Sequence, residues 1–217
     1  SMLSILANNN WKRPVYFTIT TPESNYMGLD RFLVSEGFAY RLMPIDMGLK
    51  EGDPSSIINV DQTYENVVNK FTWGNMANAS YIDPDSYRYI SMYVGSIYGQ
   101  TGQQLLAAGE TDKAKKLVLD AYQDMPKKAY LMSDVMSYVP LLEVMYKVGE
   151  SAKAGEIARR NLQFLKENMA YYEAVADTKS NLEFRNMRYG LASIQRYKQL
   201  LDQVGSPEDK KLSDELY

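Results

Sequence analysis

The sequence predicts a mainly α fold, in which an antiparallel array of helices follows a small α+β module. Two observations predict this division. Runs of β-branched and aromatic residues, interrupted by frequent turn residues, are concentrated in residues 1–80. Amphipathic segments with helical periodicity then fill almost all of residues 81–206. The charged residues 207–217 are expected to form a frayed tail.

The N-terminal module is predicted to run strand, helix, strand. An apolar, β-branched run at 15–20 favours a strand, and the run FAYRLMPI at 38–45 favours a second one. Between them, residues 26–36 carry leucine and phenylalanine at helical spacing, and Gly37 follows as a helix end. The connection is short for a parallel crossover, so we expect the two strands to pair antiparallel.

Helix-start and helix-stop signals divide the rest of the chain. A short helix at 61–71 is expected to be capped by Asp61. Asp83 and Pro84 mark the start of the helical region, with aspartate as the cap and proline in the first turn. Periodicity then predicts five helices in the array: 84–108, 111–125, 128–148, 151–176 and 180–204.

The segment 98–126 has the pattern of a helical hairpin, because two amphipathic runs flank a turn at 109–112. Small residues stand where paired helices approach closely, and a proline ends the second helix: Gly102, Ala114, Ala121 and Pro126. These spaced positions resemble the tetratricopeptide consensus. We therefore expect tetratricopeptide-like repeats, whose stacking creates concave binding surfaces.

The same turn occurs a second time, at an offset of 40 residues. GESAKA at 149–154 repeats GETDKA at 109–114. The second hairpin departs from the consensus at two positions, since Asn161 and Lys166 stand where an alanine and the closing proline are expected. Two such hairpins and a final helix would bury a core that neither hairpin can bury alone.

Composition excludes several classes of function. The 217 residues carry 24 basic and 27 acidic side chains, a formal net charge of −3, which gives no electrostatic basis for binding nucleic acid. Cysteine and histidine are absent, so thiol chemistry, the usual zinc sites and proton transfer by histidine are excluded. Asp83-Pro84-Asp85 matches a cation-binding Asp-x-Asp pattern, but its role at a helix start already accounts for it. We expect no catalytic residue, metal or cofactor in this chain.

No membrane span is expected in this chain. The longest apolar run, 131–146, is interrupted by Asp134 and Pro140 and is shorter than the ~20 residues that a spanning helix needs. A secretory signal is also missing, and Ser1-Met2 resembles an expression remnant. The chain is therefore expected to be a piece of a longer protein.

Two groups of residues are candidates for a ligand or partner surface. Trp11 and Arg13, together with Arg41, would form a cationic and aromatic patch for an anionic or sugar ligand. The alternative is an ordinary strand edge with basic side chains lying over packed surface. A series of tyrosines would line a groove for a peptide or glycan, or would equally fill a helix packed on two sides. Its members are Tyr81, Tyr87, Tyr89, Tyr93 and Tyr98, of which Tyr87, Tyr89 and Tyr93 are the site candidates.

Several phrases of the chain resemble one protein family. They are ANNNWKRPVYFTIT (7–20), MGLDRFLVSEGFAYRLMPID (27–46), NKFTWGNM (69–76) and YID (81–83). The resemblance is to the C-terminal region of large Bacteroidetes membrane proteins, whose N-terminal half resembles protein O-mannosyltransferases. It implies a parent glycosyltransferase whose catalytic acidic residues lie in the membrane half, so no catalytic residue is carried over to this chain.

The resemblance also implies a location and a role. The chain would be the soluble part on the periplasmic face of the inner membrane, next to the membrane half of the parent. It would act as a non-catalytic accessory or interaction domain that recognises or positions an acceptor protein, or supports assembly. Two alternatives stay open: a carbohydrate-active domain that uses converging Asp and Glu residues, and a purely structural cap or oligomer contact.

Overall fold

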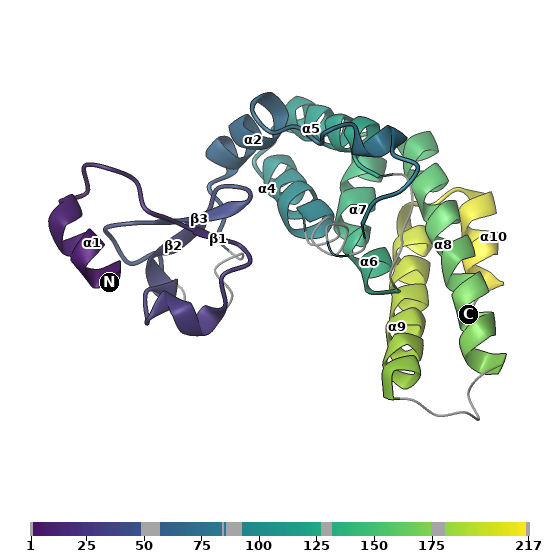
Figure 1. Ribbon diagram of the computed structural model, residues 1–217. Helices are drawn as coiled ribbons and strands as arrows, with labels where there is room; N and C mark the ends of the chain where they lie inside the picture. The colour runs from purple at the N-terminus through teal and green to yellow at the C-terminus, as the bar shows by residue number, and fades with distance from the viewer. Residues whose placement is uncertain are drawn as a thin grey trace. The chain divides into compact units, whose positions relative to one another are not determined.

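The chain folds into two units, Ser1–Phe71 and Thr72–Tyr217, in a computed structural model (Figure 1). The structure describes residues 2–48, 57–83, 85, 93–126, 132–174 and 181–215. The first unit contains a small sheet together with helices, and the second is helical. The predicted mainly α fold with a small α+β module is therefore confirmed.

A three-stranded antiparallel sheet organises the first unit. It follows helix α1 (Met2–Asn9) and is built from β1 (Tyr16–Thr18), β2 (Leu33–Ser35) and β3 (Ala39–Leu42), in the order β1-β3-β2. Phe17 of β1 lies opposite Tyr40 of β3. Because β1 and β3 fall within the two predicted strands, their expected antiparallel pairing is confirmed.

The helix predicted at 26–36 is wrong. Its residues form a 3₁₀ turn at Asp30–Phe32 followed by strand β2, and a further 3₁₀ turn precedes it at Glu23–Tyr26. Met27 and Gly28 adopt positive φ angles of 52° and 76°, which a continuous right-handed helix does not allow. Pairing of the fully buried β2 with β3 then decides the conformation of the apolar residues that follow.

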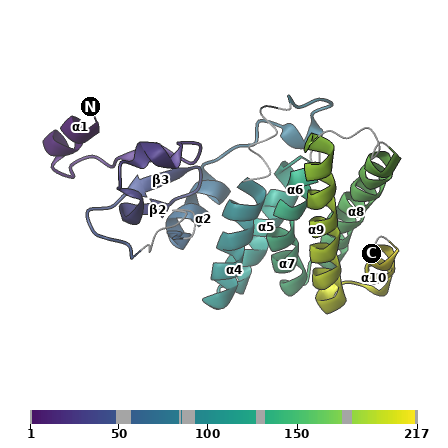
Figure 2. The ribbon, with the colours of Figure 1, turned by 90° about the horizontal axis from the view of Figure 1, so that it is seen from below.

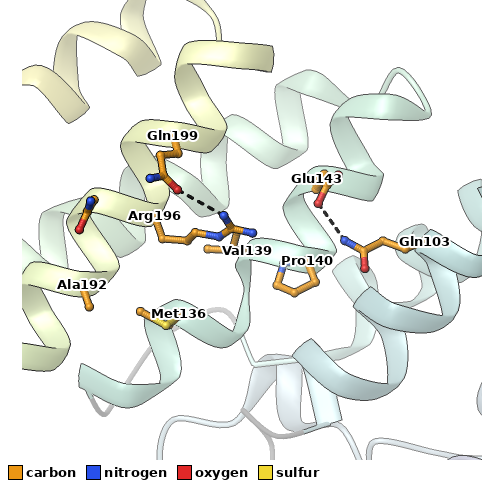
Figure 3. Close-up of a pocket in the computed structure, with 9 residues that line it drawn as sticks. Gln103, Met136, Val139, Pro140, Glu143, Ala192, Arg196 and Gln199 are labelled. Atoms are coloured by element: carbon orange, nitrogen blue, oxygen red, sulfur yellow. Dashed lines mark hydrogen bonds between the residues drawn. The ribbon is translucent and has the colours of Figure 1, made fainter. Parts of the chain in front are cut away.

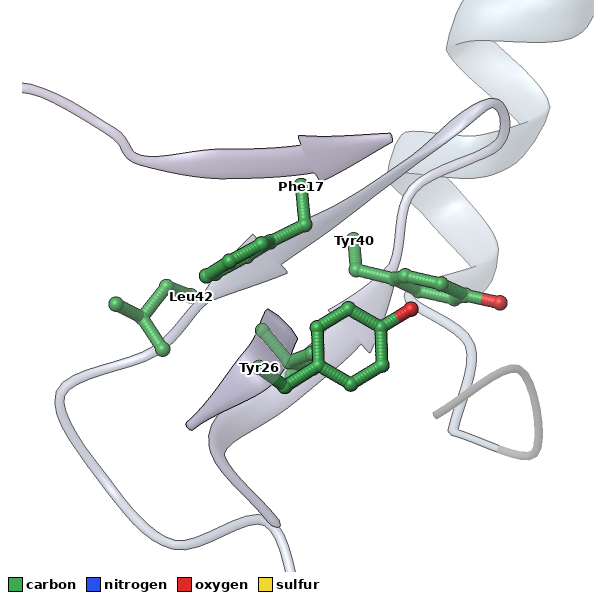
Figure 4. Packing of buried hydrophobic residues seen from close by; sticks show 5 residues of the cluster. Phe17, Tyr26, Tyr40 and Leu42 are labelled. Atoms are coloured by element: carbon green, nitrogen blue, oxygen red, sulfur yellow. The ribbon is translucent and has the colours of Figure 1, made fainter. Parts of the chain in front are cut away.

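The core of the first unit lies on one face of this sheet. The ring of Tyr26 meets Phe17 edge-on at 5.4 Å between centroids, and meets Tyr40 in the same way at 6.3 Å (Figure 4). Edge-to-face pairs of this kind are preferred by aromatic quadrupoles. Leu33 and Leu42 complete the buried cluster, so it joins all three strands to the 3₁₀ turn that carries Tyr26.

Helix α2 (Val60–Asn69) ends the first unit. Its cap is Asn59 and not Asp61, because the Asn59 side chain accepts a hydrogen bond of 3.3 Å from the backbone N–H of Gln62. The helix starts one residue earlier than predicted, which places Asp61 inside the first turn. A carboxylate in the first turn still stabilises the helix, because it lies near the positive end of the helix dipole.

Helical hairpins build the second unit, in which α7, α8 and α9 run side by side (Figure 2). The predicted helices at 111–125, 151–176 and 180–204 correspond to α5 (Thr111–Asp124), α8 (Ser151–Ala174) and α9 (Asn181–Val204). The unit also contains a 3₁₀ turn at Met76–Asn78, a π-helix at Tyr93–Gly99, α4 (Gln100–Ala107), α6 (Met132–Ser137), α7 (Val139–Lys147) and a C-terminal helix described below. Over its described residues, 132–148, the predicted helix at 128–148 is divided in two near Tyr138. Residues 84, 86–92, 128–131, 175, 176 and 180 of the predicted helices lie outside the described part.

Asp83, the predicted helix cap, makes a described contact, while residues 84 and 86–92 of the helix that it would cap lie outside the described residues. Its Oδ1 accepts a hydrogen bond of 2.9 Å from the backbone N–H of Asp85. This is the contact of an N-cap residue.

The two turns that share a sequence also share a geometry. Gly109 has φ 80° and Gly149 has φ 83°. The glutamate after each glycine closes its turn in the same way. The N–H of Glu110 donates a 2.9 Å hydrogen bond to the carbonyl of Leu105. The N–H of Glu150 donates one of the same length to the carbonyl of Met145. These are the contacts of a Schellman helix end. The 40-residue echo therefore marks equivalent positions in two hairpins, α4–α5 and α7–α8.

Glycines let the first helices of the two hairpins approach closely. A Cβ atom on Gly95 would lie 2.5 Å from the carbonyl oxygen of Ser137, and one on Gly99 would lie 2.5 Å from Cβ of Pro140. A Cβ on Gly102 would meet Val144 at 3.0 Å. The π-helix and α4 therefore lie against the end of α6 and the start of α7 with no room for side chains.

Residues 207–217, expected to be frayed, instead begin with helix α10 (Pro207–Asp214). Its reciprocal cap pairs Ser206 with Asp209. The Asp209 carboxylate is buried and accepts a 2.6 Å hydrogen bond from Nη1 of Arg159 and one of 3.3 Å from the hydroxyl of Tyr146. Gly155 of α8 leaves room for this carboxylate. These long-range contacts hold α10 against the hairpins.

Candidate binding groove between helices α4, α7 and α9

A pocket of about 380 Å³ lies where α4, α6, α7 and α9 meet (Figure 3). Gln103 of α4 and Arg196 of α9 lie on opposite sides of Pro140, at the start of α7. We call this pocket the groove. The polar and charged lining residues are Gln103, Glu143, Gln195, Arg196 and Gln199. The apolar lining residues are Met136, Val139, Pro140 and Ala192.

The wall formed by α4 and α7 carries a fixed carboxylate. Nε2 of Gln103 donates a 2.8 Å hydrogen bond to Oε2 of Glu143, and Nζ of Lys147 lies 2.6 Å from Oε1 of the same carboxylate. Partial burial pushes the pKa of Glu143 upward, but the bonds from Lys147 and Gln103 and the charges of Lys147 and Arg196 outweigh it. The pKa therefore lies below its usual value, and Glu143 is ionised at neutral pH.

The opposite wall, on α9, is cationic and rich in amides. Nη1 of Arg196 donates a long hydrogen bond of 3.3 Å to Oε1 of Gln199. Both side chains are exposed. Among the described residues no carboxylate lies within ion-pair distance of this guanidinium, which has five N–H donors in total. Arg196 therefore presents most of its hydrogen-bonding capacity to the groove.

Buried hydrogen bonds fix the rotation of α9. The hydroxyl of Tyr197 accepts a 2.8 Å bond from Nδ2 of Asn161 on α8 and donates a 3.0 Å bond to the carbonyl of Val135 on α6. All three residues are fully buried. Burial also raises the pKa of Tyr197 well above its usual value, so its hydroxyl stays protonated. Because Arg196 is the neighbouring residue, these bonds set the direction in which it faces.

The apolar floor of the groove lies at a double irregularity in the backbone. The chain leaves the α-helical path between α6 and α7, where Pro140 occupies the first turn of α7. Directly against this break lies the π-helix, through Gly95 and Gly99. π-Helical turns are rare and are frequent at functional sites. The floor of the groove is therefore formed by an irregular part of the helical unit and not by the surface of a regular α-helix.

The structure places Trp11 and Arg13 in one exposed turn after α1. Trp11 is 53% exposed and has a φ of 56°, next to Asn10 at 45°. The side chain of Asn9 holds the turn, since its Nδ2 donates to the carbonyl of Arg13 at 2.7 Å and its Oδ1 accepts from the Arg13 N–H at 3.3 Å. Neither Trp11 nor Arg13 lines the groove.

Arg41 lies on β3 and has a partner within the first unit. Its Nη1 is 3.5 Å from Oε1 of Glu36, a carboxylate only 3% exposed. Tyr16 donates to the same carboxylate at 2.9 Å, and Nδ2 of Asn59 does so at 3.0 Å. Arg41 therefore belongs to a polar cluster that connects β1, β3 and the start of α2.

The tyrosine candidates are only partly described. Tyr87 and Tyr89 lie outside the described residues, and Tyr93 is the first residue of the π-helix. Their role as a groove lining stays a prediction.

The residues that line the groove were not predicted from the sequence, because glutamines and arginines on amphipathic helices form no recognisable motif. One signal was available. Gln103 and Glu143 are separated by 40 residues, the offset of the repeated turns, so they occupy equivalent positions in the two hairpins. Polar residues at equivalent positions on neighbouring helices are candidates for one shared surface.

Comparison with known proteins gives a match to a family model. Residues 1–63 match the family model described as TMEM260-associated domain 2, which covers most of the first unit. No curated protein and no solved structure matches the chain. The chain is thus similar over its first unit to a domain named for its association with TMEM260.

The described residues contain neither a membrane-spanning helix nor a cluster of metal ligands. None of their helices has the length and apolar character needed to cross a membrane. They also contain no cluster of three or more acidic side chains that would hold a metal ion.

Proposed function

We propose that this chain is a non-catalytic accessory domain of a membrane glycosyltransferase, and that its groove holds a polypeptide segment of the acceptor. The family resemblance of its phrases and the match of residues 1–63 to TMEM260-associated domain 2 support this affiliation. The equivalent hairpins, which we take as tetratricopeptide-like, support a binding role. We place the domain on the periplasmic face of the inner membrane, beside the membrane half of the parent.

The lining of the groove is the observation that carries this proposal. Gln103, Gln195 and Gln199 each offer both a donor and an acceptor, which is what the N–H and C=O groups of an extended peptide require. The apolar floor at Val139 and Pro140 would take a side chain of that peptide. Three helices supply these groups from a rigid array.

A glycan is the less suitable occupant. Sugar rings are commonly held by stacking on aromatic faces, and none of the described lining residues is aromatic. Hydrolysis of a glycan is not supported either, because it needs two facing carboxylates. Glu143 is the sole acidic residue among the described residues that line the groove, and Lys147 and Gln103 occupy its oxygens.

Selection from a phage-displayed library of short random peptides tests this function on the full chain. Enriched peptides are synthesised with a fluorescent label, and their Kd is measured by anisotropy. We expect Gln103→Ala and Gln199→Ala to weaken binding by about two- to tenfold each, the value of one or two hydrogen bonds. Gln104→Ala is the matched control, since Gln104 is exposed on the same helix but does not line the groove.

Two outcomes would overturn the proposal. If no peptide is enriched, and deletion of this chain from the full-length enzyme still abolishes activity, a structural role replaces peptide binding. If Gln104→Ala weakens binding as much as Gln103→Ala, the peptides do not bind in the groove.

A further inference from the structure

We infer that the groove selects an acidic peptide segment, with one carboxylate bound to Arg196 and a second bound to Arg188 on the same face of α9. This inference rests on the proposed function and adds the chemistry of the ligand. It starts from the guanidinium of Arg196, which lines the groove and forms no ion pair with a carboxylate among the described residues.

Two charged side chains are found among the described residues that line the groove, the carboxylate of Glu143 and the guanidinium of Arg196. Glu143 is held by Lys147 at 2.6 Å, so this anion and this cation form a pair. Arg196 is then left without a carboxylate among the described residues, although it lines the groove. A carboxylate from outside fits the planar guanidinium with two parallel hydrogen bonds.

Further arginines continue this charge along α9. Arg185 and Arg188 are exposed, and helical geometry places them on the face that also carries Ala192 and Arg196. Arg185 precedes Ala192 by seven residues, which is two helical turns. The face of α9 that borders the groove is therefore a line of three arginines with alanine between them.

The distance between these arginines determines how far apart two acidic side chains of the ligand must lie. Arg188 and Arg196 are eight residues apart, a separation of about 12 Å along a helix that rises ~1.5 Å per residue. An extended peptide advances about 3.4 Å per residue, so it covers this distance in three to four residues. Acidic residues at positions i and i+4 would therefore reach both guanidinium groups, whereas adjacent ones would reach only one.

The preferred spacing of the acidic residues is tested with labelled peptides of fixed composition, whose binding to the full chain is measured by fluorescence anisotropy. Each is a glycine and serine peptide with two glutamates, placed either at i and i+4 or next to each other, and a third peptide has glutamine in both places. We expect the i, i+4 peptide to bind about two- to fivefold more tightly than the adjacent one, and the glutamine peptide to bind weakest. Added NaCl should reduce these differences, because the pairs are open to solvent.

Two variants locate the effect. Arg196→Gln and Arg188→Gln should each remove about two- to fivefold of the affinity for the i, i+4 peptide, and should weaken binding of the glutamine peptide by a smaller factor. Lys166→Gln is the matched control, because it removes the same charge from an exposed position on α8 that does not line the groove. Equal losses in Lys166→Gln would show a diffuse charge effect and overturn the inference.

The outcomes separate this inference from the proposed function. If selected peptides bind in the groove but tolerate replacement of glutamate by glutamine, the function stands and the acidic preference is wrong. If no peptide binds at all, the proposed function fails first. Binding of an acidic polysaccharide such as heparin with the same dependence on Arg196 and Arg188, in place of any peptide, would also overturn the inference.

Discussion

Gln103 donates a 2.8 Å hydrogen bond to Glu143, and the two residues occupy equivalent positions in successive hairpins. The two hairpins therefore share more than apolar contacts, since polar side chains at equivalent positions meet at the wall of the groove. Hydrogen bonds of this kind to a charged acceptor are stronger than those between neutral groups. The hydrogen bond from Gln103 therefore fixes the position of the Glu143 carboxylate in the groove.

Replacement of Glu143 by glutamine should make the groove more cationic while leaving the fold intact. The pair with Lys147 is half-exposed, so we expect a loss of at most about 1 kcal/mol in the free energy of unfolding. Affinity for an acidic peptide should rise by about two- to fivefold, because a nearby like charge is removed. Anisotropy and urea unfolding measure the two quantities. Glu167→Gln is the control, since Glu167 is exposed on α8 away from the groove, and weaker peptide binding by Glu143→Gln would contradict this reading.

Alanine at Gly99 should be far more costly than alanine at Gly102. The new Cβ at Gly99 would lie 2.5 Å from Pro140 and 2.9 Å from the backbone nitrogen of Leu141, which cannot move alone. We expect overpacking to lower the free energy of unfolding by about 3 kcal/mol. At Gly102 the neighbour is the Val144 side chain, and the ~1 kcal/mol gain in helix propensity offsets its displacement. Thermal unfolding of both variants gives the ranking, and equal stabilities would show that the helices can separate freely.

Asp209→Ala should release helix α10 from the hairpins. The change removes the hydrogen bonds from Arg159 and Tyr146 and half of the reciprocal cap. Arg159 is partly exposed and can be hydrated, so we expect a cost of about 2 kcal/mol and not the full penalty of a buried unpaired charge. Hydrogen exchange should become faster in α10 but not in α7. Glu208→Ala, in the exposed first turn of α10, serves as the control and should retain normal protection.

Glu36→Ala should destabilise the first unit selectively. Tyr16, Arg41 and Asn59 all lose their shared acceptor, which connects two strands to the start of α2. Removal of a buried carboxylate with three partners should lower the free energy of unfolding by about 2–4 kcal/mol. Hydrogen exchange of the β3 amides measures the effect. The same substitution at the exposed Glu65 of α2 should cost less than about 1 kcal/mol, and a similar cost at both sites would argue against the cluster.

Tyr98 should make the helical unit sensitive to alkali. Burial raises its pKa from 10.0 to about 12, against the opposing effect of the 3.1 Å hydrogen bond from Trp73. A tyrosine whose pKa is higher in the folded state stabilises the fold fully below pH 10 and loses this contribution as the pH rises through about 12. Tyr98→Phe should therefore be less stable than the parent at pH 8, but the difference should shrink towards pH 12. A constant difference across this range of urea unfolding experiments would show that Tyr98 does not titrate with unfolding.

The helices were predictable because their signals are local. Apolar periodicity and the glycines at 109 and 149 determine where each hairpin turns, and both are visible in the sequence. Strand β2 was not predictable, since Leu33 and Val34 suit a helix or a strand and only pairing with β3 decides. Helix α10 depends on contacts between Asp209 and residues 50 and 63 positions away, which no local pattern reveals.

Asn161 shows why part of the site could not be predicted. Its position suggests an alanine of the repeat, and its amide looks out of place on a packed helix face. In the structure this amide donates a hydrogen bond to the hydroxyl of Tyr197, so the residue that departs from the predicted repeat pattern helps to orient α9. The groove depends on such contacts between distant helices, whereas its exposed glutamines and arginines resemble any solvated surface.

The double anchorage of Tyr197 has a consequence for how fast a ligand can bind. Helix α9 cannot turn about its long axis without breaking the bonds to Asn161 and to the carbonyl of Val135. The helical part of the groove is thus assembled before any partner arrives, and only side-chain rotamers and the partner itself lose conformational entropy on association. Docking onto such a preformed surface is limited by encounter and orientation, with no slower folding step on the side of this chain.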